Sequence, residues 1–325
     1  MSSFSFFKKS GAPASGNSFS GLLSAVGLFA FAAVFVPLVG PVFLFLLPMI
    51  AFVNGATNGI FKTALCLLFS LAVLMLLSVG LNLDVPAVAI FTMGMAGLLM
   101  AHMAAENYSI EKIVTGPVLL IFGAIGFYFV YDAVGLGVNP WLLVKNFITV
   151  TISETIKFYS QMPLKPDDIS MIKDNENNII NSLIHIFPSL MVILSVFIIW
   201  ANLLLGKTYL RRFGIVYAQM AILARWKVTD WAIWIFIISG LLLFIPQKNF
   251  NFIGLNVFLI VCLVYLLQGL AIVSFLFQNK NVPFLIRYIF YFLIAVQQIL
   301  MIPIAVIGLF DVWFDFRKRF QKNHL

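Results

Sequence analysis

The residues best suited to chemistry are two aspartates near the C-terminus, Asp311 and Asp315, which are four positions apart. At helical spacing they share one face, and paired carboxylates of this kind can hold magnesium. Metal-assisted chemistry needs a second acidic cluster, and no other apolar segment carries one. Arg317 and Arg319 follow and Trp313 lies between, which favours a salt-bridged interfacial helix. We therefore expect no metal, no cofactor and no enzymatic activity.

A second pair with catalytic residue types is His102 and Glu106, again four positions apart, at the end of an apolar segment. An imidazole beside a carboxylate on one helix face can relay a proton or contact a ligand. The alternative is that both side chains are simply hydrated at the membrane interface.

Three glutamines, Gln268, Gln297 and Gln298, interrupt long apolar segments. An unpaired amide is costly in such surroundings, so each should have a partner, most simply another of the three. Hydrogen bonding between helices is the favoured interpretation and ligand contact the alternative.

Two further patterns favour packing or anchoring over chemistry. Gly97, Ala101 and Ala105 recur every fourth residue, as in helices that pack closely in membranes. The stretch from Ala201 to Thr208 (ANLLLGKT) resembles the end of a phosphate-binding loop, but the first glycine is missing and the motif ends an apolar helix. We interpret its lysine as an anchor on the cytoplasmic side.

Nine apolar segments must position these residues in a chain of mean hydropathy +1.06. They cover residues 21–39, 41–53, 61–81, 85–103, 113–131, 183–205, 231–245, 253–277 and 284–310. A helix crosses the hydrocarbon with about 20 residues, and long apolar runs without two-residue alternation indicate helices and not a barrel. The sequence therefore predicts an all-α, polytopic integral membrane helical bundle embedded in a lipid bilayer.

Irregular segments reduce the expected number of crossings to about eight. The second segment is short and follows Gly40-Pro41, which predicts a shallow hairpin, with Asn54 and Asn58 in the turn after it. The seventh segment is also short, and the ninth contains Gln297, Gln298 and Pro303, so one of these two is expected to be re-entrant or interfacial.

The charged loops predict the orientation of the chain. Between residues 206 and 231 the loop has five basic residues and one acid, which is typical of the cytoplasmic side. The loop from Asp132 to Asn178 has more acids than bases and is expected outside. The net charge of +8 is thus distributed as a topology signal, and no nucleic-acid partner is expected.

Within the outer loop, apolar residues recur at helical spacing from Trp141 to Tyr159. This pattern predicts an amphipathic interfacial helix that could cover a ligand, with Ile148 and Ile152 on its apolar face. We divide the chain into a disordered cytoplasmic tail (1–20), N-terminal membrane helices (21–131), this extracytoplasmic segment (132–182), C-terminal membrane helices (183–310) and a basic cytoplasmic tail (311–325).

Three short motifs carry a resemblance to a known family. They are RWKVTDW from Arg225, YLLQGLAIVSFLF from Tyr265 with NVPFLIRY after it, and GLFDVWFDFRKRF from Gly308. In these motifs and in layout the chain resembles the YybS-like family of predicted bacterial membrane proteins, whose function is unknown. The resemblance implies a multi-pass protein of the bacterial cytoplasmic (inner) membrane.

More distantly, the first six segments resemble the S components of energy-coupling-factor transporters. That resemblance implies a vitamin-like ligand bound from outside, and docking of a partner subunit on small residues such as Gly21 and Ala25. A small-molecule binding or transport protein is thus the first hypothesis, a non-catalytic membrane scaffold or regulator the second, and an intramembrane enzyme the third. A membrane partner subunit or a homo-oligomer is compatible with each.

Overall fold

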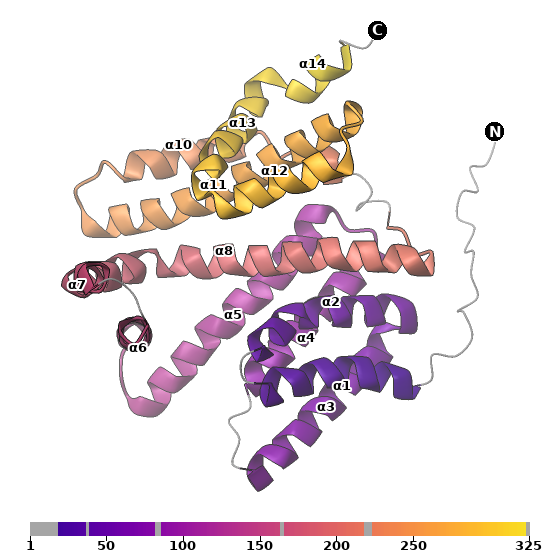
Figure 1. Ribbon diagram of the computed structural model, residues 1–325, viewed down its shortest axis with the longest axis vertical. Helices are drawn as coiled ribbons and strands as arrows, with labels where there is room; N and C mark the ends of the chain where they lie inside the picture. The colour runs from indigo at the N-terminus through magenta and orange to yellow at the C-terminus, as the bar shows by residue number, and fades with distance from the viewer. Residues whose placement is uncertain (1–18, 37–38, 82–85, 163–165, 218–222, 323–325) are drawn as a thin grey trace. The chain divides into compact units, whose positions relative to one another are not determined.

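The computed structural model describes residues 19–36, 39–81, 86–162, 166–217 and 223–322, and every regular element in these ranges is a helix. The chain forms two compact units, one from residues 1–124 with 196–221 and the other from residues 125–195 with 222–325. Two helices, α5 (Ile110–Leu136) and α8 (Glu176–Leu210), contribute to both units (Figure 1). The predicted all-α membrane bundle is confirmed.

By length and composition, six helices of the described chain can cross a membrane, or seven if one bent pair counts as a span. The six are α2 (Gly40–Asn58), α3 (Ile60–Leu81), α4 (Ala87–Ala105), α5, α8 and α11 (Lys248–Asn279). The first and seventh apolar segments form shorter helices, α1 (Phe19–Phe35) and α10 (Ala232–Leu242). Length therefore supports six or seven crossings, against the eight expected from the sequence.

The second apolar segment differs from its expectation, because α2 has 19 residues and is not a short hairpin arm. Asn54 and Asn58, expected in a turn, lie inside this helix. The Asn54 side chain donates to the Ile50 carbonyl at 2.9 Å, and the Asn58 amide donates to the side chains of Asn54 and Thr57. These polar side chains find their partners on the helix itself, so the helix continues past the last apolar residue.

The first unit is built around α2, which packs against α1, α3 and α4. Its apolar core consists of Val26, Ala30, Leu47, Ala51, Leu67, Leu71, Leu74, Ile90 and Leu98. Many apolar side chains on the outside of these helices are exposed, such as Phe61 and Val79 at 75% and 82% of their surface. Exposed apolar surface of this extent is expected of helices that face lipid.

An asparagine of α8 bonds to the backbone of α2 on both sides of Pro48, an arrangement that we call a proline repair. A proline disturbs the backbone hydrogen bonds around it. The fully buried Asn202 accepts a hydrogen bond from the Met49 N–H at 2.9 Å and donates to the Phe45 carbonyl at 2.8 Å. It thus bonds the two backbone groups, four residues apart, that a regular helix would join.

The second unit contains the rest of α5 and α8, the helices α6 (Pro140–Ser160), α7 (Pro166–Asp174), α10 and α11, and the C-terminal helices. The ninth apolar segment is split into α12 (Phe284–Val296), the single turn η3 (Gln298–Leu300) and α13 (Met301–Phe314), with a bend of 107°. A last short helix, α14 (Phe316–Lys322), follows. The irregularity predicted for this segment is therefore present as a sharp break at the glutamines.

The proline repair occurs a second time in this unit. In α8, Pro188 interrupts the helix, and Asn256 of α11 accepts from the Ser189 N–H at 2.8 Å and donates to the His185 carbonyl at 2.9 Å. The bonded positions relative to the proline are the same as those around Pro48. In each compact unit, an asparagine from a neighbouring helix thus bonds the backbone on both sides of a proline inside a helix.

The helix predicted from Trp141 to Tyr159 is confirmed as α6, and its position at the membrane interface stays a prediction. Asn139 caps its N-terminus, because its side chain accepts from the Trp141 N–H at 2.8 Å. The apolar face packs on α8 through Val144, Ile148, Ile180 and Phe187. The predicted disordered tail falls almost wholly outside the described residues.

Candidate functional site

The most distinctive polar site among the described residues is a buried cluster around Asp311, which we call the Asp311 cluster. Asp311 of α13 is fully buried, and one of its carboxylate oxygens, Oδ2, accepts from Gln268 Nε2 at 3.1 Å. The same oxygen lies 3.4 Å from a guanidinium nitrogen of Arg317. Gln268 Oε1 in turn accepts from the Val228 N–H at 3.1 Å.

The chain turns sharply at Asp315, and this turn brings Arg317 to Asp311. Asp315 has a φ of 41°, in the left-handed region, and its N–H donates to the Asp311 carbonyl. The second carboxylate oxygen of Asp311 then accepts from the Phe316 N–H at 2.9 Å. Arg317 also donates to the Trp226 carbonyl at 2.7 Å. Burial lowers the pKa of Arg317, and the charge of Asp311 opposes that shift.

The Asp311 cluster joins the three sequence motifs that carried the family resemblance. Trp226 and Val228 come from the first motif, Gln268 from the second, and Asp311 and Arg317 from the third. These segments are far apart along the chain, and no pattern within any one of them reveals the others as partners.

Close packing of α11 and α13 places the two sides of the cluster next to each other. A side-chain carbon added at Gly269 would lie 2.0 Å from the Ile304 carbonyl oxygen, and one at Gly308 would lie 2.0 Å from that of Tyr265. Only glycine therefore allows the two backbones to approach this closely. Neither glycine was singled out from the sequence.

The two aspartates considered as magnesium ligands have different partners. Asp315 is paired with Lys318 at 2.6 Å, and the hydrogen bond from Lys318 lowers the pKa of Asp315. Among the described residues, no group of three or more histidine, cysteine, aspartate or glutamate side chains could hold a metal ion. Trp313 and Phe314 are exposed beside these charges, and Arg319 stacks over Phe314 at 5.2 Å.

The expectation that the three glutamines pair with one another is wrong. Gln268 is bonded within the Asp311 cluster, whereas Gln297 and Gln298 are exposed at the break between α12 and α13. Their separation has a physical reason. The backbone leaves the helix at Gln297, and an exposed amide can be satisfied without a protein partner.

His102 and Glu106 both lie at the C-terminal end of α4 and both are exposed. The bond recorded between them joins the Glu106 N–H to the His102 carbonyl at 3.0 Å, within the backbone. Both their functional role and their position at the membrane interface stay predictions.

The small-residue positions of α4 lie against α2. A side-chain carbon at Gly97 would meet the Pro48 carbonyl oxygen at 2.2 Å, and Ala101 is buried beside Gly55. Ala105 is exposed. Gly21 and Ala25 are both in α1, but the side-chain environment of residues 19–24 is outside the described structure.

Ile148 and Ile152, predicted to cover a ligand, belong to the apolar contact between α6 and α8. Ile148 is 5% exposed and Ile152 is partly buried against the same cluster. They therefore contribute to packing, and a role in ligand binding stays a prediction.

An apolar groove lies beside the Asp311 cluster, between α8, α10, α11 and α13, with a volume of about 520 Å³. Ile193, Phe236, Leu266 and Ala305 contribute to its lining from the four helices. Tyr265 also lines it, and the hydroxyl of this tyrosine is buried without a hydrogen-bond partner among the described residues. The groove was not foreseen from the sequence, because its walls come from helices that are apolar on several faces.

These observations define the class of the protein as a polytopic helical membrane protein with a buried polar cluster and an adjacent apolar groove. The chain belongs to the family described as "Predicted membrane protein (DUF2232)", whose model matches residues 24–312. It is similar to the "Uncharacterized protein YybS" of Bacillus subtilis (strain 168), with 24% identity over 92% of this chain and 96% of that protein. No solved structure matches the chain.

The family match confirms the predicted resemblance to YybS-like proteins. It ends at residue 312, so it contains Gln268 and Asp311 but not Arg317. None of the comparisons supports the more distant resemblance to S components.

Proposed function

We propose that this protein is a binding protein for a lipid-like small molecule, which it holds in the groove between α8, α10, α11 and α13. The observation that carries the proposal is the groove itself. Its volume of about 520 Å³ lies in the range of small-molecule sites, roughly 300–1,000 Å³. Its almost wholly apolar lining suits a hydrocarbon better than a polar, vitamin-like solute.

The broken helix pair supports a binding role as well. The segment after the break, from Met301 to Leu309, forms one wall of the groove. Discontinuous helices often form the substrate sites of transporters, so transport of the bound molecule is the natural extension of this proposal.

The proposal also covers where the protein is located and whether it is an enzyme. We place the protein in the bacterial cytoplasmic membrane, because the chain is multi-pass and its relative comes from a Bacillus. We also propose that it is not an enzyme. The ion pairs of Asp311 with Arg317 and of Asp315 with Lys318 support this, because they occupy the two carboxylates best suited to catalysis.

Mass spectrometry of small molecules retained by detergent-purified protein tests the binding role. We expect a lipid-like molecule in stoichiometric amount on the native protein. Ala305→Phe, which fills the groove, should abolish retention. Val296→Phe is the matched control, because Val296 is 63% exposed on α12, outside the groove. Native protein that carries nothing above bulk lipid, or equal retention by both variants, would refute the proposal.

A non-catalytic scaffold is the second candidate, and the Asp311 cluster favours it. The recorded hydrogen bonds of Gln268 and Asp311 go to other parts of the same chain, as expected of a structural tie. If the protein is only a scaffold, Ala305→Phe should complement a deletion strain fully. Gly97→Leu should fail to complement, because it would force α4 away from α2.

A further inference from the structure

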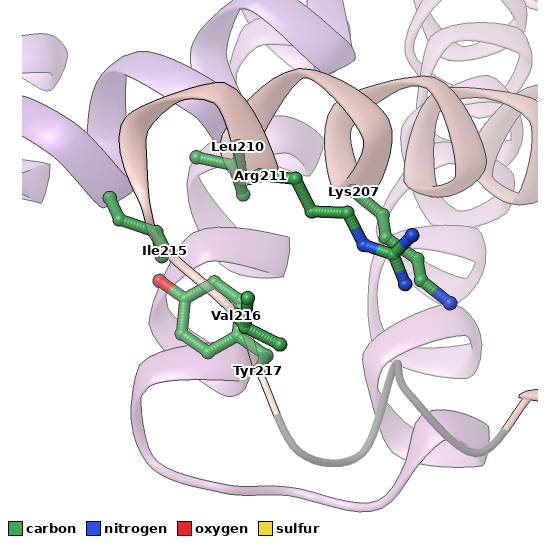
Figure 2. Close-up of a pocket in the computed structure, with 6 residues that line it drawn as sticks. All are labelled: Lys207, Leu210, Arg211, Ile215, Val216 and Tyr217. Carbon is green, nitrogen blue, oxygen red and sulfur yellow. The ribbon is translucent and has the colours of Figure 1, made fainter.

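A polar pocket, which we call the α6 pocket, lies in the second unit between the end of α6, α7 and the start of α8, and it does not depend on the groove. Its volume is about 690 Å³, within the range of small-molecule sites. The lining includes Ser153, Ile156, Lys157 and Ser160 of α6, Lys173 of α7 and Glu176 of α8. By contrast, the pocket in Figure 2, at the end of α8, holds about 10 Å³, the room that a single water needs. The α6 pocket is therefore the better candidate for a ligand.

A hydrogen bond between α6 and α8 holds one wall of the α6 pocket in place. The Ser153 hydroxyl donates to Glu176 Oε1 at 2.6 Å, and both side chains are partly buried. Ile156, which is 7% exposed, supplies the apolar part of the lining. Among the described residues, the second carboxylate oxygen of Glu176, Oε2, has no recorded partner. This oxygen can therefore accept a hydrogen bond from a ligand.

Two lysines supply the positive charge of the α6 pocket. Lys157 and Lys173 are both exposed, and neither has a hydrogen bond or an ion pair with another described residue. The acids closest to them in sequence, Glu154 and Asp174, are not part of the described lining, in which Glu176 is the one acid. A lysine ammonium is a common phosphate ligand, because it offers a compact charge and three hydrogen-bond donors.

We propose that the α6 pocket binds a water-soluble phosphate ester of the sugar phosphate class. The phosphate, which carries about two negative charges at neutral pH, would contact both Lys157 and Lys173. The hydroxyl groups of the sugar would donate to Glu176 and accept from the Gln161 amide, which also lines the pocket. Only Ile156 in the described lining is apolar, so the pocket offers little surface to an acyl chain. A soluble ester therefore fits it better than a phospholipid.

Isothermal titration calorimetry of the detergent-purified full-length protein tests the site with glucose 6-phosphate, glucuronate and inorganic phosphate. We expect glucose 6-phosphate to bind most tightly, because glucuronate has a smaller charge and inorganic phosphate lacks the sugar hydroxyls. Lys157→Gln and Lys173→Gln should each weaken its binding roughly tenfold, or about 1.4 kcal/mol, since each removes one cation from the pocket. Lys145→Gln is the matched control and should leave the affinity nearly unchanged, because Lys145 is an exposed lysine of α6 that does not line the pocket.

Glu176→Gln tests the sugar end of the site separately. It removes the one acid of the described lining, so inorganic phosphate should bind more tightly. Glucose 6-phosphate should lose part of its advantage, because a neutral acceptor replaces a charged one. The proposal is overturned by absent binding of glucose 6-phosphate, by equal affinity for glucuronate, or by an unchanged ratio of the two phosphate affinities in Glu176→Gln. Equal weakening by Lys145→Gln and the two pocket variants, or displacement of the sugar phosphate by short-chain phosphatidylglycerol, would overturn it as well.

Discussion

At the scale of single residues, the notable group near the C-terminus is the carboxylate of Asp311, which is fully buried. A carboxylate is very costly to bury unless it is paired and hydrogen-bonded. Asp311 meets that condition with the Gln268 amide, the Phe316 N–H and the Arg317 guanidinium. Removing one member of such a pair leaves the other charge buried and unpaired, so the pair is sensitive to single substitutions.

The first prediction compares the two aspartates. Asp311→Ala should destabilise the protein by about 3–5 kcal/mol, because it leaves Arg317 without its counter-ion. Asp315→Asn, which tolerates the left-handed backbone at this position, should have a much smaller effect, because the Lys318 side chain that Asp315 pairs with is 80% exposed. Unfolding of the purified variants in a denaturing detergent titration measures both. Similar losses for the two variants would show that Asp311 is not a buried structural charge.

The second prediction concerns pH. The hydrogen bond from Lys318 lowers the pKa of Asp315 below its ordinary value of 3.8, so the stabilisation from this pair is present above that pH. It is lost as the pH falls through the lowered folded-state pKa. The native protein should therefore melt at a higher temperature than Asp315→Asn near neutral pH, with the gap closing in acid. A gap that stays constant through the acid range would contradict the assignment.

Residue types alone predicted part of this site. The sequence indicated that the C-terminal aspartates would form salt bridges, and they do. It could not indicate that Gln268 pairs with Asp311, because those residues are 43 positions apart and every apolar face looks alike before the helices are packed. The cost of burying an amide predicts that a partner exists, but not which one.

At the scale of elements, the two asparagines explain how α2 and α8 stay helical through an internal proline. In each, a buried asparagine bonds the backbone groups that the proline separates. The sequence contained the components of both repairs, an asparagine within an apolar run and a proline within another. Their pairing depends on the three-dimensional packing and was missed.

The third prediction is a double-mutant cycle on the second repair. Asn256→Leu should destabilise the protein by about 1 kcal/mol or more, because the Ser189 N–H and the His185 carbonyl lose their partners. In a Pro188→Ala background the helix can close its own hydrogen bonds, so the same substitution should cost less. Thermal unfolding of the four proteins gives the coupling. Additive effects would mean that the asparagine does not act through the proline.

Hydropathy located the membrane helices well but misjudged the lengths of some. The expected segment 41–53 ends where apolar residues end, whereas α2 continues through Asn54, Thr57 and Asn58 because these side chains bond within their own helix. The break at Gln297 was predictable, since polar residues and a proline interrupt an apolar run there. The angle of 107° was not, because it is set by packing against α11.

At the scale of the whole molecule, the orientation in the membrane is the fourth prediction. In a protein without Cys66 and Cys262, a cysteine at position 174 should react with an impermeant maleimide in intact cells. Cysteines at 212 and 322 should react only after lysis, because Lys/Arg-rich loops and tails remain in the cytoplasm. The reverse labelling of 174 and 212 would invert the orientation, and reaction at 322 in intact cells would place the C-terminal tail outside.

The central claim is that the groove between α8, α10, α11 and α13 holds a lipid-like molecule. Photo-crosslinking in cells tests it most directly, with a photoreactive amino acid at Leu266, which lines the groove, or at Leu293, which is 48% exposed on α12. The account predicts one dominant adduct mass at Leu266 and a mixture of bulk lipids at Leu293, identified by mass spectrometry of the purified protein. The same lipid mixture at both positions, or no small-molecule adduct at Leu266, would contradict it.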